Sequence, residues 1–351
     1  MKEALILAIV AMIFLVIFQI AKASEYVSVL KGEEKTRRQS NKINGFLLVA
    51  FLIAGLIGVY ICNKWFFHKT LFVQGSASVE GEEIDNMLYM TIAVTGVIFI
   101  ITQVLLFWFC FKYQEKDGKK AFFFPHNTKL ELIWTTVPAI FLTILVVFGL
   151  INWFNMTGPA PDKAILVEIT GHQFNWEMRY PGRDGVFGKK DYKLYNNPSG
   201  NILGVDFNDG NSKDDLHTVE MHLPVNIPVK LIIGAQDVIH DVGLNHFRMK
   251  MDAVPGIPTT LWFTPKYTTA EMKKRTNNQN FVYEISCDQI CGKGHYSMRG
   301  VIVVETEAEY KKWLSEQTPE YITLNKLKTP VSDSTAKPTE EVAALTTGVK
   351  K

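Results

Sequence analysis

The sequence predicts two regions, an α-helical membrane region followed by an all-β sandwich. Residues 1–154 contain four long apolar runs, whereas the chain after them has short β-branched and aromatic stretches broken by Pro and Gly. A helix needs about 18 apolar residues to span a bilayer. Short stretches that alternate apolar and polar residues between turn residues are typical of antiparallel strands.

Four runs reach or approach the spanning length. They cover residues 4–21, 45–62, 87–111 and 132–154, and the last two contain no charged residue. Trp108, Trp134 and Trp153 lie toward the ends of these two runs, where aromatic side chains anchor helices at the membrane interface. We therefore expect four membrane-spanning helices.

The charges between the runs predict the orientation. Lys and Arg predominate after the first run and Lys after the third, whereas Glu and Asp outnumber Lys after the second. Because basic loops remain in the cytoplasm, the N-terminus and the chain beyond Phe154 are expected outside. Residues 21–23 also resemble a signal-peptidase site. Cleavage there would leave three spans and put the C-terminal region in the cytoplasm, so a retained helix is favoured.

The region after Phe154 is expected to form a small antiparallel sandwich with a long insertion. The insertion covers residues 181–215, which are rich in Gly, Asn and Asp and are interpreted as surface loops. Residues 206–215 have a weak likeness to a calcium loop but lack EF-hand spacing. Beyond Glu316 the chain is polar with few aromatic residues, which predicts a tail that is largely disordered or lies on a neighbouring subunit.

Charge and cysteine usage exclude some classes of protein. The chain has 351 residues and a formal net charge of +2, which gives no reason to expect nucleic-acid binding. Of its four cysteines, Cys62 and Cys110 lie in apolar runs, so no disulfide framework is expected.

A cluster of metal-binding residue types lies near the end of the sandwich region. Cys287, Cys291, His295 and Met298 fall within twelve residues, and His240 ends an earlier β-type stretch. Two thiolates, imidazoles and a thioether favour copper over magnesium or calcium. One copper ion needs only one thiolate, so two thiolates indicate a bridged pair of copper ions that share one electron. Such a centre suits electron transfer.

Other interpretations of the same residues remain open. Cys287 and Cys291 could form a disulfide in an extracytoplasmic domain. A zinc site with two Cys and two His is possible, although it leaves Met298 unexplained. A mononuclear blue-copper site uses a single Cys, so the second cysteine counts against it.

The stretch SCDQICGKGHYSMRGV, residues 286–301, resembles the binuclear CuA centre of subunit II of haem–copper cytochrome c oxidases. The resemblance implies a cupredoxin-like sandwich in which Cys287 and Cys291 bridge two copper ions. It also implies that His240 and His295 bind one copper ion each. The Met298 thioether and the Gln289 carbonyl would occupy weaker positions. Gln289 replaces the family's glutamate, which puts the magnesium site shared with the catalytic subunit in doubt.

The helices also resemble this family. Residues 87–111 and 132–154 are similar to its two-helix hairpin, and the first two runs are additional. Glu131 matches a glutamate at the mouth of a proton pathway, although a charge at a helix N-terminus also stabilises the helix dipole. The additional helices are expected to pack against partner subunits.

Residues 171–180, GHQFNWEMRY, resemble the family segment through which cytochrome c donates its electron. The family's first tryptophan is Phe174 here, and Trp176 matches its second. The path could therefore run through Trp176 or another aromatic residue, or the donor could be a bound c-type cytochrome. The alternative is that Phe174 and Trp176 are ordinary sandwich aromatics. His172 is expected to make a structural hydrogen bond.

The expected protein is subunit II of a cytochrome c oxidase in a bacterial inner membrane, with the CuA domain on the periplasmic side. It would take electrons from a cytochrome c and pass them to haem in the catalytic subunit I, which also holds CuB and would reduce oxygen with proton translocation. The expected domains are residues 1–64, two additional helices with a basic cytoplasmic loop; 65–156, the helix hairpin; 157–310, the CuA domain; and 311–351, a polar tail. The alternative is a membrane-tethered copper carrier or assembly factor with a labile, mononuclear metal.

Overall fold

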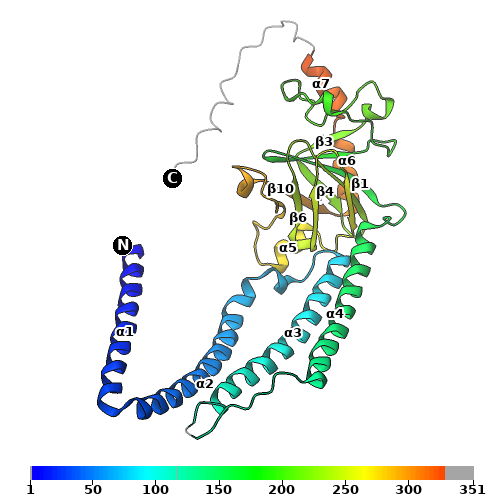
Figure 1. Ribbon diagram of the computed structural model, residues 1–351. Coiled ribbons are helices and arrows are strands. Elements are labelled where there is room, and N and C mark those ends of the chain that lie inside the picture. The colour runs from blue at the N-terminus through cyan, green and yellow to red at the C-terminus, as the bar shows by residue number, and fades with distance from the viewer. Residues whose placement is uncertain (1, 117, 329–351) are drawn as a thin grey trace. The chain divides into compact units, whose positions relative to one another are not determined.

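The computed structural model describes residues 2–116 and 118–328 (Figure 1), with side chains for residues 9–116 and 118–325. The chain divides into two compact units, with the boundary between Asn155 and Met156. The first unit is helical and the second is mainly β-structure.

Four long helices make up the first unit, as the sequence predicts. They are α1 (Lys2–Lys31), α2 (Glu33–Phe66), α3 (Val79–Lys112) and α4 (Thr128–Thr157). Each contains a segment long and apolar enough to cross a membrane. Almost none of the described side chains in these segments are buried. Such apolar surface is compatible with lipid around the helices.

Local sequence explains where these helices begin and end. Gly32 alone separates α1 from α2, and its φ of 83° is a conformation that glycine adopts at little cost. At the start of α3, the Ser78 hydroxyl accepts a hydrogen bond from the Gly81 amide. That bond satisfies one of the amide groups that have no partner inside the helix. Two 3₁₀ turns, Phe67–Lys69 and Leu71–Gln74, connect α2 to α3.

The second unit is a sandwich of two five-stranded sheets, with strand orders β3-β2-β1-β5-β8 and β4-β10-β9-β6-β7. The first sheet contains β1 (Ile165–His172), β2 (Asn175–Tyr180), β3 (Leu216–Thr218), β5 (Val229–Ala235) and β8 (Thr259–Phe263). The second contains β4 (Glu220–Pro224), β6 (His240–Leu244), β7 (Met249–Ala253), β9 (Tyr283–Cys287) and β10 (Arg299–Glu305). The predicted sandwich is therefore confirmed.

The prediction of a purely antiparallel sandwich is wrong in two strand pairs. β1 pairs with β5 in parallel, and so does β10 with β4. Alternation of apolar and polar residues shows which face of a strand is buried but not the direction of its neighbour. β5 illustrates this, because its side chains alternate strictly between buried and half-buried positions.

The insertion after β2 is more buried than its composition predicts. Leu203 is fully buried and Val205 is almost so, while Ser212 is buried in the short helix η5 (Gly210–Lys213). Two further 3₁₀ turns, Tyr192–Leu194 and Asn197–Ser199, lie in the same segment. Residues 181–215 nevertheless form a mainly surface insertion, as predicted, with a few buried side chains.

Three helices follow or interrupt the strands of the second unit. α5 (Thr269–Arg275) lies between β8 and β9, while α6 (Glu307–Glu316) and α7 (Glu320–Lys328) follow β10. Leu324 and Glu320 on α7 are buried. The prediction of a disordered tail beyond Glu316 is thus wrong for α7, and its remainder, residues 329–351, lies outside the described part of the chain.

Candidate metal centre

Three segments of the second sheet bring the predicted ligands together. His240 is the first residue of β6 and Cys287 is the last residue of β9, and these strands pair so that Val242 lies opposite Cys287. The chain then forms the loop that contains Cys291 and a 3₁₀ turn, His295–Ser297, before β10 begins. Strand ends therefore position one imidazole and one thiol, and the loop supplies the remaining donors.

The two cysteine sulfurs lie between two imidazole nitrogens. The Sγ atoms of Cys287 and Cys291 are 3.7 Å apart. His240 Nδ1 lies 3.8 Å from Cys287 Sγ, and His295 Nδ1 lies 3.7 Å from Cys291 Sγ. Both thiols are free, and their separation exceeds the roughly 2.05 Å of a disulfide bond. Each sulfur thus has an imidazole of its own, and the two sulfurs face each other.

Two weaker donors complete the group. Met298 Sδ lies 3.8 Å from Cys291 Sγ, and the carbonyl oxygen of Gln289 lies 3.2 Å from Cys287 Sγ. Met298 is only 1% exposed, so its thioether is directed into the group and away from solvent. Two sulfur anions, two imidazoles, a thioether and a carbonyl exceed the four ligands of a tetrahedral zinc site. Soft donors of these types fit copper.

The ligands are largely shielded from water. His240 is fully buried, both cysteines are below 10% exposed, and His295 is half-buried. Burial, together with the neighbouring Cys287, raises the pKa of the Cys291 thiol to about 11. Because a metal binds thiolate, metal loading must displace a proton from this thiol.

Asp237 and Gln173 make hydrogen bonds that support the ligand residues, and neither was predicted from the sequence. Asp237 Oδ1 lies 2.9 Å from His240 Nε2, and its other oxygen accepts a hydrogen bond from the Gln173 amide at 2.8 Å. Although burial opposes its ionisation, the hydrogen bond from His240 holds the pKa of Asp237 below its usual value. With the proton on Nε2, the Nδ1 lone pair of His240 faces the sulfurs.

The Gln173 side chain extends this support to the loop, since its Nε2 donates to the Cys291 carbonyl at 2.6 Å. A metal-binding histidine commonly donates its second N–H to a carboxylate. That rule could have directed attention to Asp237, three residues before His240.

Phe174 and Trp176 lie beside the centre in different environments. Trp176 is fully buried, with its ring centroid 5.8 Å from that of His240. Phe174 is 37% exposed, and a Cβ atom at Gly294 would lie 2.6 Å from its ring. Glycine at position 294 therefore lets the Phe174 ring lie close to the ligand loop. Trp176 lies beneath the surface, and Phe174 borders solvent.

His172 makes the structural hydrogen bond predicted for it. Its Nε2 lies 3.0 Å from Glu177 Oε1, and His217 Nε2 lies 2.8 Å from the second oxygen. Burial of Glu177 would raise its pKa, but the hydrogen bonds from the two histidines lower it to about 2.

Among the described residues, one group of three or more His, Cys, Asp or Glu has ligand atoms close enough to hold a metal, namely His240, Cys287 and Cys291.

Glu131 lies in the helical unit, in the first turn of α4. Its carboxylate accepts a hydrogen bond from the Asn127 amide at 3.3 Å, and the Asn127 side chain accepts one from the Leu130 amide at 3.0 Å. These contacts are those of a helix cap. The role of Glu131 in proton uptake stays a prediction.

Comparisons with known proteins agree with the division into membrane helices and a sandwich domain. The transmembrane domain of cytochrome c oxidase subunit II matches residues 67–151, and its periplasmic domain matches residues 165–306. The alternative cytochrome c oxidase subunit 2 of Bradyrhizobium diazoefficiens is 34% identical over 238 residues, which are 67% of this chain and 80% of that protein. The cytochrome c oxidase subunit 2 of Cereibacter sphaeroides is 28% identical over 253 residues, 69% of this chain and 78% of that protein.

A solved structure of similar sequence is the periplasmic domain of subunit II of cytochrome oxidase (CoxB) of Bradyrhizobium japonicum. It is 26% identical, with a TM-score of 0.30, and the match covers 49% of this chain and 99% of that domain.

The helices and the sandwich therefore define a membrane protein with a cupredoxin-like domain of the periplasmic type. More particularly, the chain belongs to the cytochrome c oxidase subunit II family. It is thus a subunit of a cytochrome c oxidase complex, its partner is a catalytic subunit, and catalysis lies in that other subunit. Copper binding is a property implied by the family.

Proposed function

We propose that this chain accepts electrons for the oxidase through a binuclear CuA centre and passes them to haem in the catalytic subunit. The observation that carries the proposal is the pair of free, buried thiols 3.7 Å apart, each with an imidazole Nδ1 within 3.8 Å. One thiol would suffice for a mononuclear copper site. Two sulfurs facing each other, with a histidine at either end, match what a sulfur-bridged pair requires.

Each donor has a defined part in this proposal. Cys287 and Cys291 bridge the two metal positions, while His240 and His295 bind one position each. Met298 and the Gln289 carbonyl lie at the weaker positions. When bound, the copper pair supplies a site that takes up and releases one electron at a time.

The protein's contribution is to keep these donors fixed. Strands β6 and β9 hold His240 and Cys287, and Asp237 fixes the His240 ring. Gln173 ties the carbonyl of Cys291 to the first sheet. Ligands held by a rigid frame and by hydrogen bonds around them move little when the charge of the centre changes. A small movement favours fast electron transfer.

Electrons are proposed to enter at the exposed side of Phe174. Phe174 borders solvent beside the ligand loop, and the exposed apolar side chains of Ile290 and Tyr296 lie in that loop. Exposed aromatic and apolar side chains are typical of contact surfaces between proteins. Trp176 is buried and would be the next aromatic residue of the electron path beneath this surface. The donor in this proposal is a cytochrome c or a bound c-type cytochrome.

The helices are proposed to anchor the copper domain in a bacterial inner membrane. Four spans with the N-terminus outside would put the sandwich on the periplasmic side, as the basic loops predict. Residues 1–64 would contribute the additional helices, 65–156 the hairpin, 157–310 the copper domain and 311–351 the C-terminal segment. Glu131 would lie at the cytoplasmic edge, where proton uptake by the complex is proposed. With Gln289 in place of glutamate, no magnesium site is proposed.

The substitution Cys291→Ser tests the proposal. It removes one bridging sulfur, so the absorption spectrum of the binuclear centre and oxidase turnover should both be lost while membrane insertion is retained. Cys110→Ser is the matched control, because Cys110 is an exposed thiol in α3. An unchanged spectrum in Cys291→Ser would contradict the assignment. A labile, mononuclear metal in the native chain would instead favour a copper carrier.

A further inference from the structure

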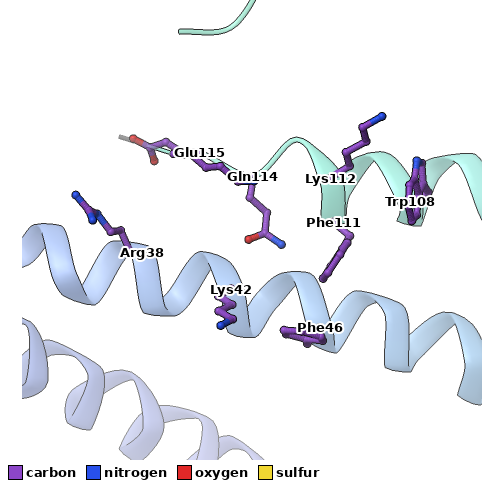
Figure 2. A pocket seen from close by; sticks show the side chains of 9 residues that line it. Arg38, Lys42, Phe46, Trp108, Phe111, Lys112, Gln114 and Glu115 are labelled. Atoms are coloured by element: carbon purple, nitrogen blue, oxygen red, sulfur yellow. The ribbon is translucent and has the colours of Figure 1, made fainter. Parts of the chain in front are cut away.

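A pocket of about 740 Å³ lies between α2 and the end of α3, within the helical unit (Figure 2). Four basic side chains line it. Arg38 and Lys42 are in α2, Lys112 is the last residue of α3, and Lys116 follows that helix. Figure 2 shows these two segments side by side, with the Phe111 and Gln114 side chains directed toward α2. The copper ligands are in the other unit, so this pocket is a separate feature of the chain.

The floor of the pocket is aromatic and closely packed. The rings of Phe46 and Phe111 meet edge to face at 5.3 Å, and Trp108 continues this wall (Figure 2). Gly45 is buried because the Gln114 side chain occupies the space that a Cβ atom would need. Glycine at this position lets the two helices approach closely. The pocket therefore has an apolar base and a basic rim.

The position of the pocket along the helices corresponds to a membrane surface. The apolar run of α2 begins at Gly45, and that of α3 ends at Phe111. Lys42 and Lys112 lie just outside these runs, and Trp108 lies just inside. Tryptophan is enriched where lipid headgroups meet the hydrocarbon. Basic residues near helix ends extend toward the headgroups.

The charges around the pocket are unbalanced. Among the described residues that line it, the acidic one is Glu115, which lies 3.4 Å from Arg37, and Arg38 pairs with Glu34 at 3.0 Å. Among the residues whose side chains are described, no carboxylate lies within 4.0 Å of Lys42 or Lys112, although Lys112 Nζ lies over the Tyr113 ring at 5.4 Å. An anion would therefore complement the rim.

We propose that this pocket binds an anionic phospholipid, with its phosphate among the basic side chains and an acyl chain along Phe46 and Trp108. Basic pockets between membrane helices on the cytoplasmic side bind lipid headgroups of this kind. A phospholipid fits both features of the pocket, because it has a negative headgroup and an apolar tail. All of α2, including Lys42 and Phe46, precedes the residues that match the family's transmembrane domain, 67–151. The site therefore combines an additional helix, α2, with the end of α3, which lies within the matched residues.

The double variant Lys42→Gln/Lys112→Gln tests this proposal in the purified oxidase complex. After delipidation, the complex is titrated with phosphatidylglycerol and the bound lipid is counted by native mass spectrometry. Each basic residue near an anionic surface contributes a factor of about five to binding, so the double variant should bind roughly 30-fold more weakly. The control Lys119→Gln/Lys120→Gln loses the same charge at exposed loop positions outside the pocket and should bind as the wild type does.

Three results would overturn the proposal. Equal binding by the double variant and the control would mean that lipid is attracted by charge alone or that another subunit fills the pocket. Displacement of the lipid by millimolar inorganic phosphate would identify a free-anion site. Equally tight binding of phosphatidylcholine would show that the basic rim does not select the lipid.

A second measurement uses the wild-type complex and does not depend on how the variants fold. Phosphatidylglycerol with a photoreactive acyl chain should label peptides that contain Phe46 or Trp108. Labelling confined to other peptides would contradict the proposed site.

Discussion

The hydrogen bond between Asp237 and His240 makes a quantitative prediction about copper affinity. Asp237→Ala removes the acceptor 2.9 Å from His240 Nε2 and the acceptor for the Gln173 amide. The ring of His240 is then free to rotate or to move its proton to Nδ1, which would turn the lone pair away from Cys287. Loss of such a partner typically weakens metal binding by about 10–100-fold, which corresponds to roughly 1.4–2.7 kcal/mol.

The affinity is measured by competition between the purified protein and a copper chelator of known affinity. Asp237→Asn should fall between the alanine variant and the wild type, because one amide oxygen replaces two acceptor oxygens that serve different donors. Asp162→Ala is the control, since Asp162 is an exposed carboxylate before β1. An affinity of Asp237→Ala within about threefold of the wild type, well below the loss expected for such a partner, would refute the role assigned to this carboxylate.

Three further predictions concern the surroundings of the centre. Gly171→Ala puts a Cβ atom 2.8 Å from the Trp176 ring, so thermal unfolding should report a loss of about 1–3 kcal/mol. Glu177→Gln should flatten the pH dependence of stability. The pKa of Glu177 is lowered to about 2 and that of His217 is raised above 6.5, so the ion pair is complete between about pH 4.5 and 6.5. The wild type should then lose more stability than the variant between pH 6 and 9 in denaturant titrations, and equal slopes would exclude this pairing. Phe174→Ala should lower kcat/KM for cytochrome c about tenfold with an unchanged copper spectrum, and an unaltered rate would move the donor site elsewhere.

The ligand group could be predicted from the sequence because most of it is local. Cys287, Cys291, His295 and Met298 lie within twelve residues, so their spacing alone brings them close. His240 could be added because it follows a β-type stretch that a sandwich would bring near the loop, although the structure shows it at the start of β6. The long apolar runs were equally informative, since length and composition alone indicate a spanning helix.

The support around the ligands could not be predicted in the same way. Gln173 lies 64 residues from Asp237 and 118 residues from Cys291, and both contacts depend on how the two sheets pack. No local spacing encodes such contacts. Sequence pattern identifies the strands, but their order and direction emerge only from the complete sandwich.

Segments stabilised by tertiary contacts were also misjudged from composition. Leu203 and Val205 are two apolar residues in a polar segment, too few to produce a periodic pattern, yet both are buried. In α7 the buried side chains of Leu324 and Glu320 hold a helix whose composition suggests a disordered tail. Short helices depend more on packing than on intrinsic propensity.

The number of copper ions that share one electron tests the central claim most directly. Low-temperature electron paramagnetic resonance of the purified protein, combined with a copper count, should find one unpaired spin for every two copper ions, coupled equally to both nuclei. A spin coupled to a single copper nucleus, or one copper ion or zinc per chain, would contradict the bridged pair between Cys287 and Cys291.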